Sequence, residues 1–460
     1  MIPTRLTFAL CFLAAPAAAQ ELSRDEVAQV GRVVETTLAD TGVPSASVAV
    51  VRGGKLVFAR AYGQRSDRAG VADANAILPV ASVSKQFTAA ALLLLEDEGK
   101  LSLDDTVSKH LPGITGGDGI TLRQLVSHTS GLQDYWPQDY SFDAMKRPTS
   151  PQGILGRWAR KPLDFQPGTQ WQYSNTGYVA AGLIVEKLSS EPLMRFLERR
   201  FFRPLSLKVI DQDVAVGAAY PIGYERFALG PVRAAPPPAR GWLYAAGGLA
   251  MSAADLARWN IARLDRAIMP AEDWEAQETP VLLADGTSSG YGLGVFVGTR
   301  DGRRFVAHDG AAVGFLTQNI VYPDDRAAVT VIINGDFSDA QATIAAGIAK
   351  IVLPAPDEAK VTARARQMFE SLVAGAPDRA RLTQNANGYF TPTALADYRT
   401  SLAALGTPTA FEPAREPRLR GGFVNRNYLV TYPTRKLRIV TYAEPGAAGR
   451  YEQFLVQPAS

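Results

Sequence analysis

The sequence predicts an α/β protein of the α+β kind, with a mainly antiparallel sheet that is flanked by helices and carries an inserted helical region. Strand patterns lie at both ends of residues 25–353, whereas residues 103–245 are rich in helical, turn and proline patterns. Strands that are joined by short turns pair antiparallel, so the two groups of strands predict one sheet with a helical insert. Further patterns beyond residue 358 predict a small α+β domain.

Residues 1–19 are predicted to be a cleaved signal peptide. Arg5 precedes the apolar run Leu6–Ala14, which is too short to cross a bilayer, and small residues end at Ala19 as at a cleavage site. We therefore expect an exported protein, periplasmic or secreted, without a transmembrane anchor. The single cysteine, Cys11, lies in this segment, so the mature chain would contain no disulfide and no thiolate metal site.

The first elements of the mature chain are a helix and a hairpin. Asp25–Leu38 has the apolar spacing of an amphipathic helix. In residues 45–63, two apolar runs flank Gly53 and Gly54, a pair that tolerates the positive φ values of a two-residue turn. The apolar run that begins after Lys85 predicts a buried helix.

The later part of the main domain returns to strands. Ser252 is expected to cap a helix that begins at Ala253, and Ser338 is expected to cap a closing helix that runs to Leu353. Strand patterns lie between these two helices at 291–298, 304–310, 317–323 and 327–335.

Residues 354–358 are the predicted linker, and residues 359–460 are the predicted accessory domain. In that domain we expect helices near 362–374 and 392–405, followed by strands at 427–433, 436–442 and 451–457. We find no cluster of polar residues there that points to chemistry.

Charge and composition exclude several classes of partner. The net charge is +3, and the basic residues do not form one stripe with aromatic residues, so we expect no nucleic-acid partner. The three histidines, His110, His128 and His308, lack the spacing of metal ligands. We therefore expect no metal and no cofactor. The sequence does not specify an oligomeric state.

Ser82 and Lys85 open the buried helix and lie three residues apart, hence on one helix face. Free N–H groups and the helix dipole at this end would stabilise an oxyanion. A desolvated lysine has a lowered pKa, so its neutral amine could accept the serine proton. The alternative is structural, with a capping serine and a lysine that reaches water.

Two further motifs contain groups that suit the same chemistry. Tyr173 and Asn175 would place a phenol and an amide on one side of a loop, where the phenol could relay protons. His308 ends a strand, Gly310 allows a close backbone approach, and the N–H of Ala311 could be an oxyanion donor. A core aromatic loop and a structural histidine are the alternatives.

Together these motifs resemble the serine β-lactamases and penicillin-binding proteins, in which S-x-x-K occurs with two partner motifs. The chain looks like the class C β-lactamase-related branch through Ser82–Lys85, Tyr173–Asn175 and His308–Gly310. Two more segments resemble that branch, "LRQLVSHTSGL" at 122–132 and "AAGGLAMSAADLARW" at 245–259. The resemblance covers residues 27–353 and implies a β-lactamase/transpeptidase-like fold.

The resemblance implies a role for each motif residue. Ser82 would be the acylated nucleophile, and Lys85 and Tyr173 would share proton transfer. Asn175 would hold Lys85 and the substrate amide, and the N–H groups of Ser82 and Ala311 would form the oxyanion hole. His128 is expected to stabilise the loop beneath the site.

His308 stands where class C β-lactamases carry the lysine of K-T-G. The H-x-G pattern is similar to that of D,D-peptidases, D-aminopeptidases and some esterases of the family. We therefore expect a serine hydrolase whose substrate is a small molecule or a peptide, including peptidoglycan-derived peptides. A class C β-lactamase proper and a non-catalytic peptidoglycan-binding protein are the alternatives. "GTSSG" at 286–290 matches a nucleophile elbow, but no helix pattern follows it.

Overall fold

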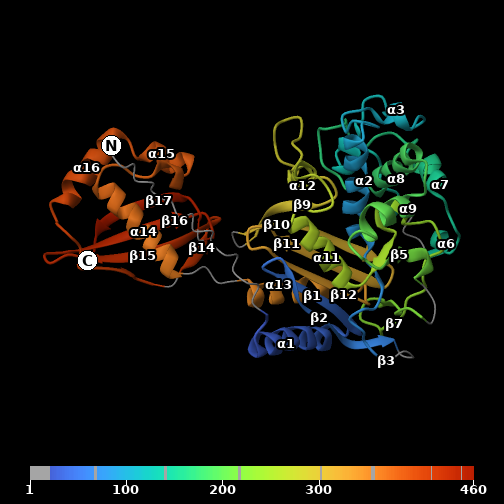
Figure 1. Cartoon of the computed structure of the whole chain (residues 1–460), viewed down its shortest axis with the longest axis horizontal. Helices are drawn as coiled ribbons and strands as arrows, with labels where there is room; N and C mark the ends of the chain where they lie inside the picture. Colours follow the sequence, from blue (N-terminus) through green and yellow to red (C-terminus); the bar gives the residue numbers. More distant parts are fainter. Residues whose placement is uncertain are drawn as a thin grey trace, which may run out of the picture. The chain divides into compact units, whose positions relative to one another are not determined.

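The computed structural model (Figure 1) describes residues 21–66, 70–138, 142–215, 219–300, 303–353, 358–415, 417–446 and 448–459. The predicted signal peptide and residues 354–357 of the predicted linker lie outside these ranges. The chain divides into two compact units, Met1–Val297 with Val306–Val352, and Gly298–Phe305 with Leu353–Ser460. Each unit is described by itself.

A seven-stranded sheet forms the centre of the first unit. Its strand order is β3-β2-β1-β12-β11-β10-β9, and neighbours from β3 to β10 pair antiparallel. The N-terminal hairpin and the last strands meet where β1 pairs with β12, which confirms the predicted antiparallel sheet with a helical insert. The strands are β1 (Ser45–Arg52), β2 (Lys55–Ser66), β3 (Gly70–Val71), β9 (Phe296–Arg300), β10 (Arg303–Ala312), β11 (Phe315–Tyr322) and β12 (Ala327–Ile333).

The hairpin turn follows from its two glycines. Gly53 and Gly54 have φ values of 58° and 75°, in the left-handed region that a two-residue turn of this kind requires. By contrast, the strand pattern at 291–298 begins too early, since β9 starts at Phe296 and Tyr291 forms only an isolated bridge with it.

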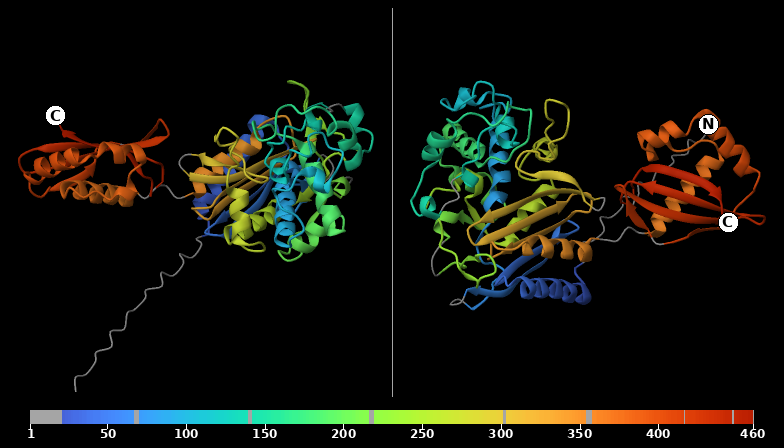
Figure 2. Two further views of the ribbon diagram at one scale, coloured as in Figure 1. Left: turned by 90° about the horizontal axis from the view of Figure 1, so that it is seen from above. Right: turned by 180° about the vertical axis from the view of Figure 1, so that it is seen from behind.

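Helices cover both faces of this sheet. α1 (Arg24–Thr41) and α13 (Ala340–Val352) pack together on one face, and α11 (Ala253–Leu264) contacts β1 and β12 from the other (Figure 2). Coverage on both sides explains why every residue of β12 is buried. As predicted, Ser252 caps α11, whereas α13 begins two residues after Ser338, whose hydroxyl accepts the N–H of Ala340.

The inserted region surrounds one buried helix, α2 (Lys85–Asp97), whose residues from Lys85 to Leu95 are all buried. α2 contacts α8, α10 and α12. A short sheet of order β4-β8-β5 lies beside it. The remaining elements include α3 (Val107–His110), α4 (Leu122–Val126), α5 (Tyr135–Gln138), α6 (Phe142–Met145), α7 (Pro151–Trp158), α8 (Asn175–Ser189), α9 (Leu193–Leu197), α10 (Tyr244–Gly247), α12 (Ala271–Glu278), β4 (Leu78–Pro79), β5 (Val209–Asp211) and β8 (Leu249–Met251).

The second unit has its own core and an antiparallel sheet of order β13-β15-β16-β17, with β14 paired to β15. The predicted strands are present, as are the two predicted helices, whereas α15, β13 and β14 were not predicted. Its elements are α14 (Glu358–Val373), α15 (Gln384–Tyr389), α16 (Pro392–Ala403), β13 (Ala410–Pro413), β14 (Arg418–Arg420), β15 (Phe423–Thr431), β16 (Lys436–Ala443) and β17 (Tyr451–Pro458).

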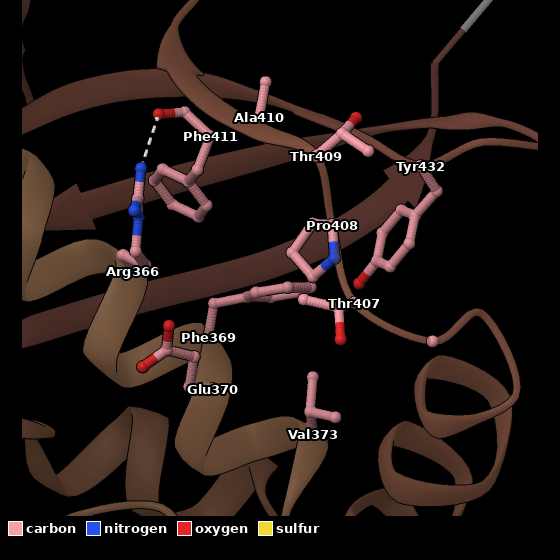
Figure 3. A pocket seen from close by; sticks show the side chains of 11 residues that line it. Arg366, Phe369, Glu370, Val373, Thr407, Pro408, Thr409, Ala410, Phe411 and Tyr432 are labelled. Atoms are coloured by element: carbon pink, nitrogen blue, oxygen red, sulfur yellow. Dashed lines mark hydrogen bonds between the residues drawn. The ribbon is translucent and has the colours of Figure 1, made fainter.

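A cavity of about 380 Å³ lies between α14, the segment 406–411 and Tyr432 in this unit (Figure 3). Arg366 and Glu370 of α14 line it, and Arg366 donates a hydrogen bond to the Phe411 carbonyl at 3.3 Å. The sequence did not reveal these polar groups, because both occur in a helix pattern as ordinary solvent-facing charges. No helix of the described residues is apolar and long enough to cross a bilayer.

Candidate active site

Ser82 lies in a tight turn that connects the short sheet to α2. The turn is the 3₁₀ segment Ala81–Ser84, which follows β4 and continues directly into α2. Ala81 has a φ of 47°, an unfavourable value for alanine that reverses the chain immediately before Ser82. The Ser82 side chain is half-buried and therefore remains accessible. Lys85 is the first residue of α2 rather than a residue one turn inside it.

The Lys85 ammonium is fully buried and contacts three oxygen atoms. Nζ lies 2.9 Å from Ser82 Oγ, 2.8 Å from Asn175 Oδ1 and 2.6 Å from the Ala246 carbonyl. Burial lowers the pKa of Lys85 to about 7, although the charges of Asp134 and Asp309 act in the opposite direction. Both protonation states are therefore populated near neutral pH.

This geometry orients the neutral amine. A neutral lysine has two hydrogens and one lone pair, and two of its three neighbours, Asn175 Oδ1 and the Ala246 carbonyl, can only accept. When they hold the two hydrogens, the lone pair points to the third neighbour, Ser82 Oγ, which can donate its proton. The site therefore contains a nucleophile and a base in direct contact.

Tyr173 lies against the same amine. Lys85 Nζ is 4.8 Å from the centre of the Tyr173 ring. Burial raises the pKa of Tyr173 well above 10, and a side-chain hydrogen bond with Ser82 only partly offsets this. Tyr173 is therefore a neutral phenol at physiological pH.

Asn175 begins α8, with Ser174 as the capping residue. Its amide nitrogen Nδ2 donates to both carboxylate oxygens of Asp134, at 3.1 and 3.2 Å, and its backbone N–H donates to Asp134 Oδ1 at 3.1 Å. Sequence reasoning missed Asp134, which lies in the loop "LQDYW". Its position three residues after the glycine of "HTSGL" gave no chemical indication.

His308 is buried beneath the site. Its Nδ1 lies 2.6 Å from the Asp309 carbonyl, which can only accept, so Nδ1 carries the hydrogen and Nε2 accepts from the Tyr291 hydroxyl at 2.9 Å. Burial lowers the pKa of His308 to about 4, so the ring is neutral. Nε2 is thus occupied by Tyr291, a partner that the sequence did not indicate.

Gly310 brings β10 against the serine turn. A Cβ atom at this position would lie 2.2 Å from the Val80 carbonyl oxygen and 3.3 Å from the Ala81 side chain. The glycine therefore permits close packing of β10 on the segment before Ser82. Ala311, the next residue, is exposed and pairs with Leu316 of β11.

His128 supports the tyrosine loop, as the sequence suggested. Its Nδ1 accepts the Ser174 N–H at 3.1 Å, and its ring stacks on Tyr173 with centroids 4.2 Å apart. Burial lowers the pKa of His128 well below 6.5, so it is neutral. Within the described residues, no group of three or more His, Cys, Asp or Glu side chains could hold a metal ion.

Comparison with known proteins identifies the family. The model of the family described as "Beta-lactamase" matches residues 30–353. The chain belongs to the beta-lactamase family. It is a serine hydrolase of the β-lactamase and penicillin-binding-protein group.

Individual relatives agree with this assignment. Penicillin-binding protein 4* of Bacillus subtilis (strain 168) is 29% identical over 324 residues, which are 65% of this chain and 70% of that protein. A D-stereospecific amidohydrolase from Streptomyces sp. has a similar structure, with a TM-score of 0.61 and 27% identity over 69% of this chain and 96% of its own. The octameric penicillin-binding protein homologue from Pyrococcus abyssi, at 20% identity, shares the fold over 94% of this chain and 99% of its own, with a TM-score of 0.63.

Proposed function

We propose that the protein is an exported hydrolase that forms an acyl-enzyme on Ser82 and cleaves amides or esters of D-amino acids. The observation that carries this proposal is the 2.9 Å contact between Ser82 Oγ and Lys85 Nζ, in a site that orients the neutral amine. Export rests on the predicted signal peptide at residues 1–19.

In the acylation step, Lys85 Nζ takes the proton of Ser82 Oγ, and Oγ attacks the carbonyl carbon of the substrate. The negative charge on the carbonyl oxygen would be stabilised by the N–H groups of Ser82 and Ala311. The tetrahedral intermediate then collapses, the bond to the leaving group breaks, and the proton on Lys85 reaches that group through the Tyr173 hydroxyl. The amine or alcohol departs and an ester on Ser82 remains.

Water completes the reaction by attacking the ester, while the amine of Lys85 takes its proton directly or through Tyr173. Ser82 Oγ recovers a proton as it leaves, and the free acid is released. We assign the base to Lys85 rather than Tyr173, because the pKa of Lys85 is about 7 whereas that of Tyr173 is raised well above 10.

The charges beside the serine favour a substrate with a free ammonium group. Asp309 is exposed, and within the described residues its carboxylate has no ion-pair partner. Its charge acts on Lys85, Tyr173 and His308, which places it beside the reacting groups. A carboxylate here attracts the ammonium of an amino-acid amide and repels the carboxylate of a β-lactam or of a peptide C-terminus. The neutral His308 supplies no compensating positive charge.

The likeness to the D-stereospecific amidohydrolase supports the choice of D-amino-acid substrates. A class C β-lactamase proper and a non-catalytic peptidoglycan-binding protein are the competing assignments, and one set of assays separates them. The substrates are D- and L-phenylalanine p-nitroanilide, p-nitrophenyl acetate, nitrocefin and a peptide that ends in D-Ala-D-Ala.

We expect the wild-type protein to hydrolyse the D-anilide and the ester fastest, and Ser82→Ala to lose all of this turnover. Nitrocefin hydrolysis at the rate of the best ester would instead favour the β-lactamase. Absence of turnover with every substrate, together with binding of a muropeptide, would favour the binding protein.

A further inference from the structure

A buried carboxylate lies directly behind the groups that hold the lysine. Asp134 is 7% exposed and precedes α5. Its donors in the described part of the chain include the Trp136 N–H, at 3.1 Å to Oδ1, and the backbone and side-chain N–H groups of Asn175. The carboxylate also faces the first turn of α8, where the helix dipole favours a negative charge.

Asp134 determines which way the Asn175 amide faces. A carboxylate has no hydrogen to donate, so it accepts only the NH₂ side of the amide. A rotated amide would set its oxygen against two carboxylate oxygens and its NH₂ group against the Lys85 amine. With Asp134 in place, Asn175 Oδ1 is held toward Lys85 Nζ at 2.8 Å.

The orientation of that oxygen decides where the lysine lone pair points. The neutral amine can give its two hydrogens to Asn175 Oδ1 and the Ala246 carbonyl only if both oxygens face it. Without the Asn175 acceptor, one hydrogen of the amine can turn toward Ser82 Oγ, and the lone pair then no longer faces the serine proton.

We propose that Asp134 is a positioning residue of the hydrolase: through Asn175 it aims the lone pair of Lys85 at Ser82. This inference rests on the proposed function of Ser82 and Lys85. Asp134 is hydrogen-bonded to Asn175, so we assign it a positioning role rather than a direct part in the reaction.

Charge around Lys85 sets the expected pH dependence. Asp134 and Asp309 are the negative groups that raise the pKa of Lys85 against burial, while His128 and His308 are neutral and Tyr173 and Tyr178 are phenols. Removal of the Asp134 charge therefore lowers the pKa of Lys85 further. Because the neutral amine is the active form, the acidic limb of kcat/KM should move to lower pH.

The first test is Asp134→Asn, which keeps the shape of the side chain. On the pH plateau, where Lys85 is neutral in both proteins, we expect kcat to fall about 10- to 100-fold, because the lone pair of Lys85 no longer points at Ser82. We expect KM to stay within about twofold of the wild-type value. Asp255→Asn is the control. That carboxylate is also buried and also lies at a helix start, but its partners are Ser252 and Arg258. We expect the control to lower thermal stability without moving the pH profile.

The second test exchanges the pair in the double variant Asp134→Asn/Asn175→Asp. The new amide at 134 can donate its NH₂ to the new carboxylate at 175 and still accept the backbone N–H of residue 175 at its oxygen, and the negative charge now faces Lys85 directly. We expect plateau kcat to recover at least tenfold over Asp134→Asn, and the acidic limb to move above its wild-type position, because the ammonium form is stabilised more strongly.

Failure of this inference is distinguishable from failure of the proposed function. Labelling of wild-type Ser82 by a fluorophosphonate supports the function, whatever Asp134 does. With that labelling present, a folded Asp134→Asn with wild-type kcat and pH profile overturns the inference. If Asp134→Asn does not fold, the double variant Asp134→Asn/Asn175→Asp is the deciding test. An acidic limb of kcat/KM that stays at its wild-type position in the double variant, or failure of the double variant to fold, also overturns the inference.

Discussion

At Lys85, burial and hydrogen bonding produce a lysine that is a base near neutral pH. Its pKa is lowered to about 7 by burial, and activity requires the neutral form. Protonation of Lys85 below pH 7 removes the base, so activity falls as the pH falls. We expect kcat/KM to fall about tenfold per pH unit below pH 7 and to be level above about pH 8. A pH-rate profile with a neutral ester checks this. A rising limb near pH 10 would indicate an ordinary lysine.

Asp309 gives a second prediction at the residue scale. Asp309→Asn removes the exposed negative charge beside the site, so the preference for cationic over anionic substrates should fall by about tenfold. The ratio of kcat/KM for D-phenylalanine p-nitroanilide and for a peptide ending in D-Ala-D-Ala measures it. The ratio should be taken near pH 7, where the α-amino group of the anilide is an ammonium, and the accompanying change in the pKa of Lys85 cancels because it affects both substrates alike. An unchanged ratio would place the source of selectivity elsewhere.

The sequence could predict the residues whose side chains are reactive, but not the residues that orient those side chains. Ser82 and Lys85 follow from spacing on a helix, and their contact in the structure has the expected form. Asp134 and Ala246 could not be found in this way, because one is an acidic residue in a loop and the other acts through its carbonyl. The charge state of Tyr173 depends on burial by distant segments, which no local pattern shows.

At the scale of elements, the approach of β10 to the serine turn depends on Gly310. In Gly310→Ala the new methyl would meet the Val80 carbonyl oxygen at 2.2 Å, so either the strand or the turn must move. We expect a loss of about 1–3 kcal/mol in the free energy of unfolding and loss of most activity. Thermal or urea unfolding and ester hydrolysis measure both effects.

Gly156→Ala in α7 is the matched control for this change. Nothing lies within 4 Å of a Cβ atom there, and alanine favours a helix, so we expect stability to rise by about 0.5–1 kcal/mol with activity unchanged. Equal effects of the two substitutions would contradict the packing argument for Gly310.

Elements with a strong local pattern were predicted best. The Gly53–Gly54 hairpin and the Ser252 cap are specified by neighbouring residues and occur as expected. The start of β9 was misplaced by five residues because Tyr291–Val295 is apolar for another reason: Tyr291 is buried against His308 and the aromatic rings around it. Burial in a core and burial in a strand give the same local pattern.

For the whole molecule, the separate cores of the two units bear on where the activity resides. One core is built from the sheet and α2, and the other from α14 and the second sheet. All the residues of the candidate site belong to the first unit. We expect a chain that ends at residue 353 to retain Ser82 labelling within about threefold of the full-length rate. Loss of labelling by a folded truncated protein would show that the second unit contributes to the site.

Intact-protein mass spectrometry after reaction with a fluorophosphonate or a penicillin tests acylation of Ser82 most directly. We expect one covalent adduct on the wild-type protein, located on Ser82 by peptide mapping. We also expect the adduct to form at least about a hundredfold more slowly on Lys85→Ala and not at all on Ser82→Ala. An adduct that persists on Ser82→Ala, or that forms on Lys85→Ala at the wild-type rate, would show that Ser82 and Lys85 are not the nucleophile and its base.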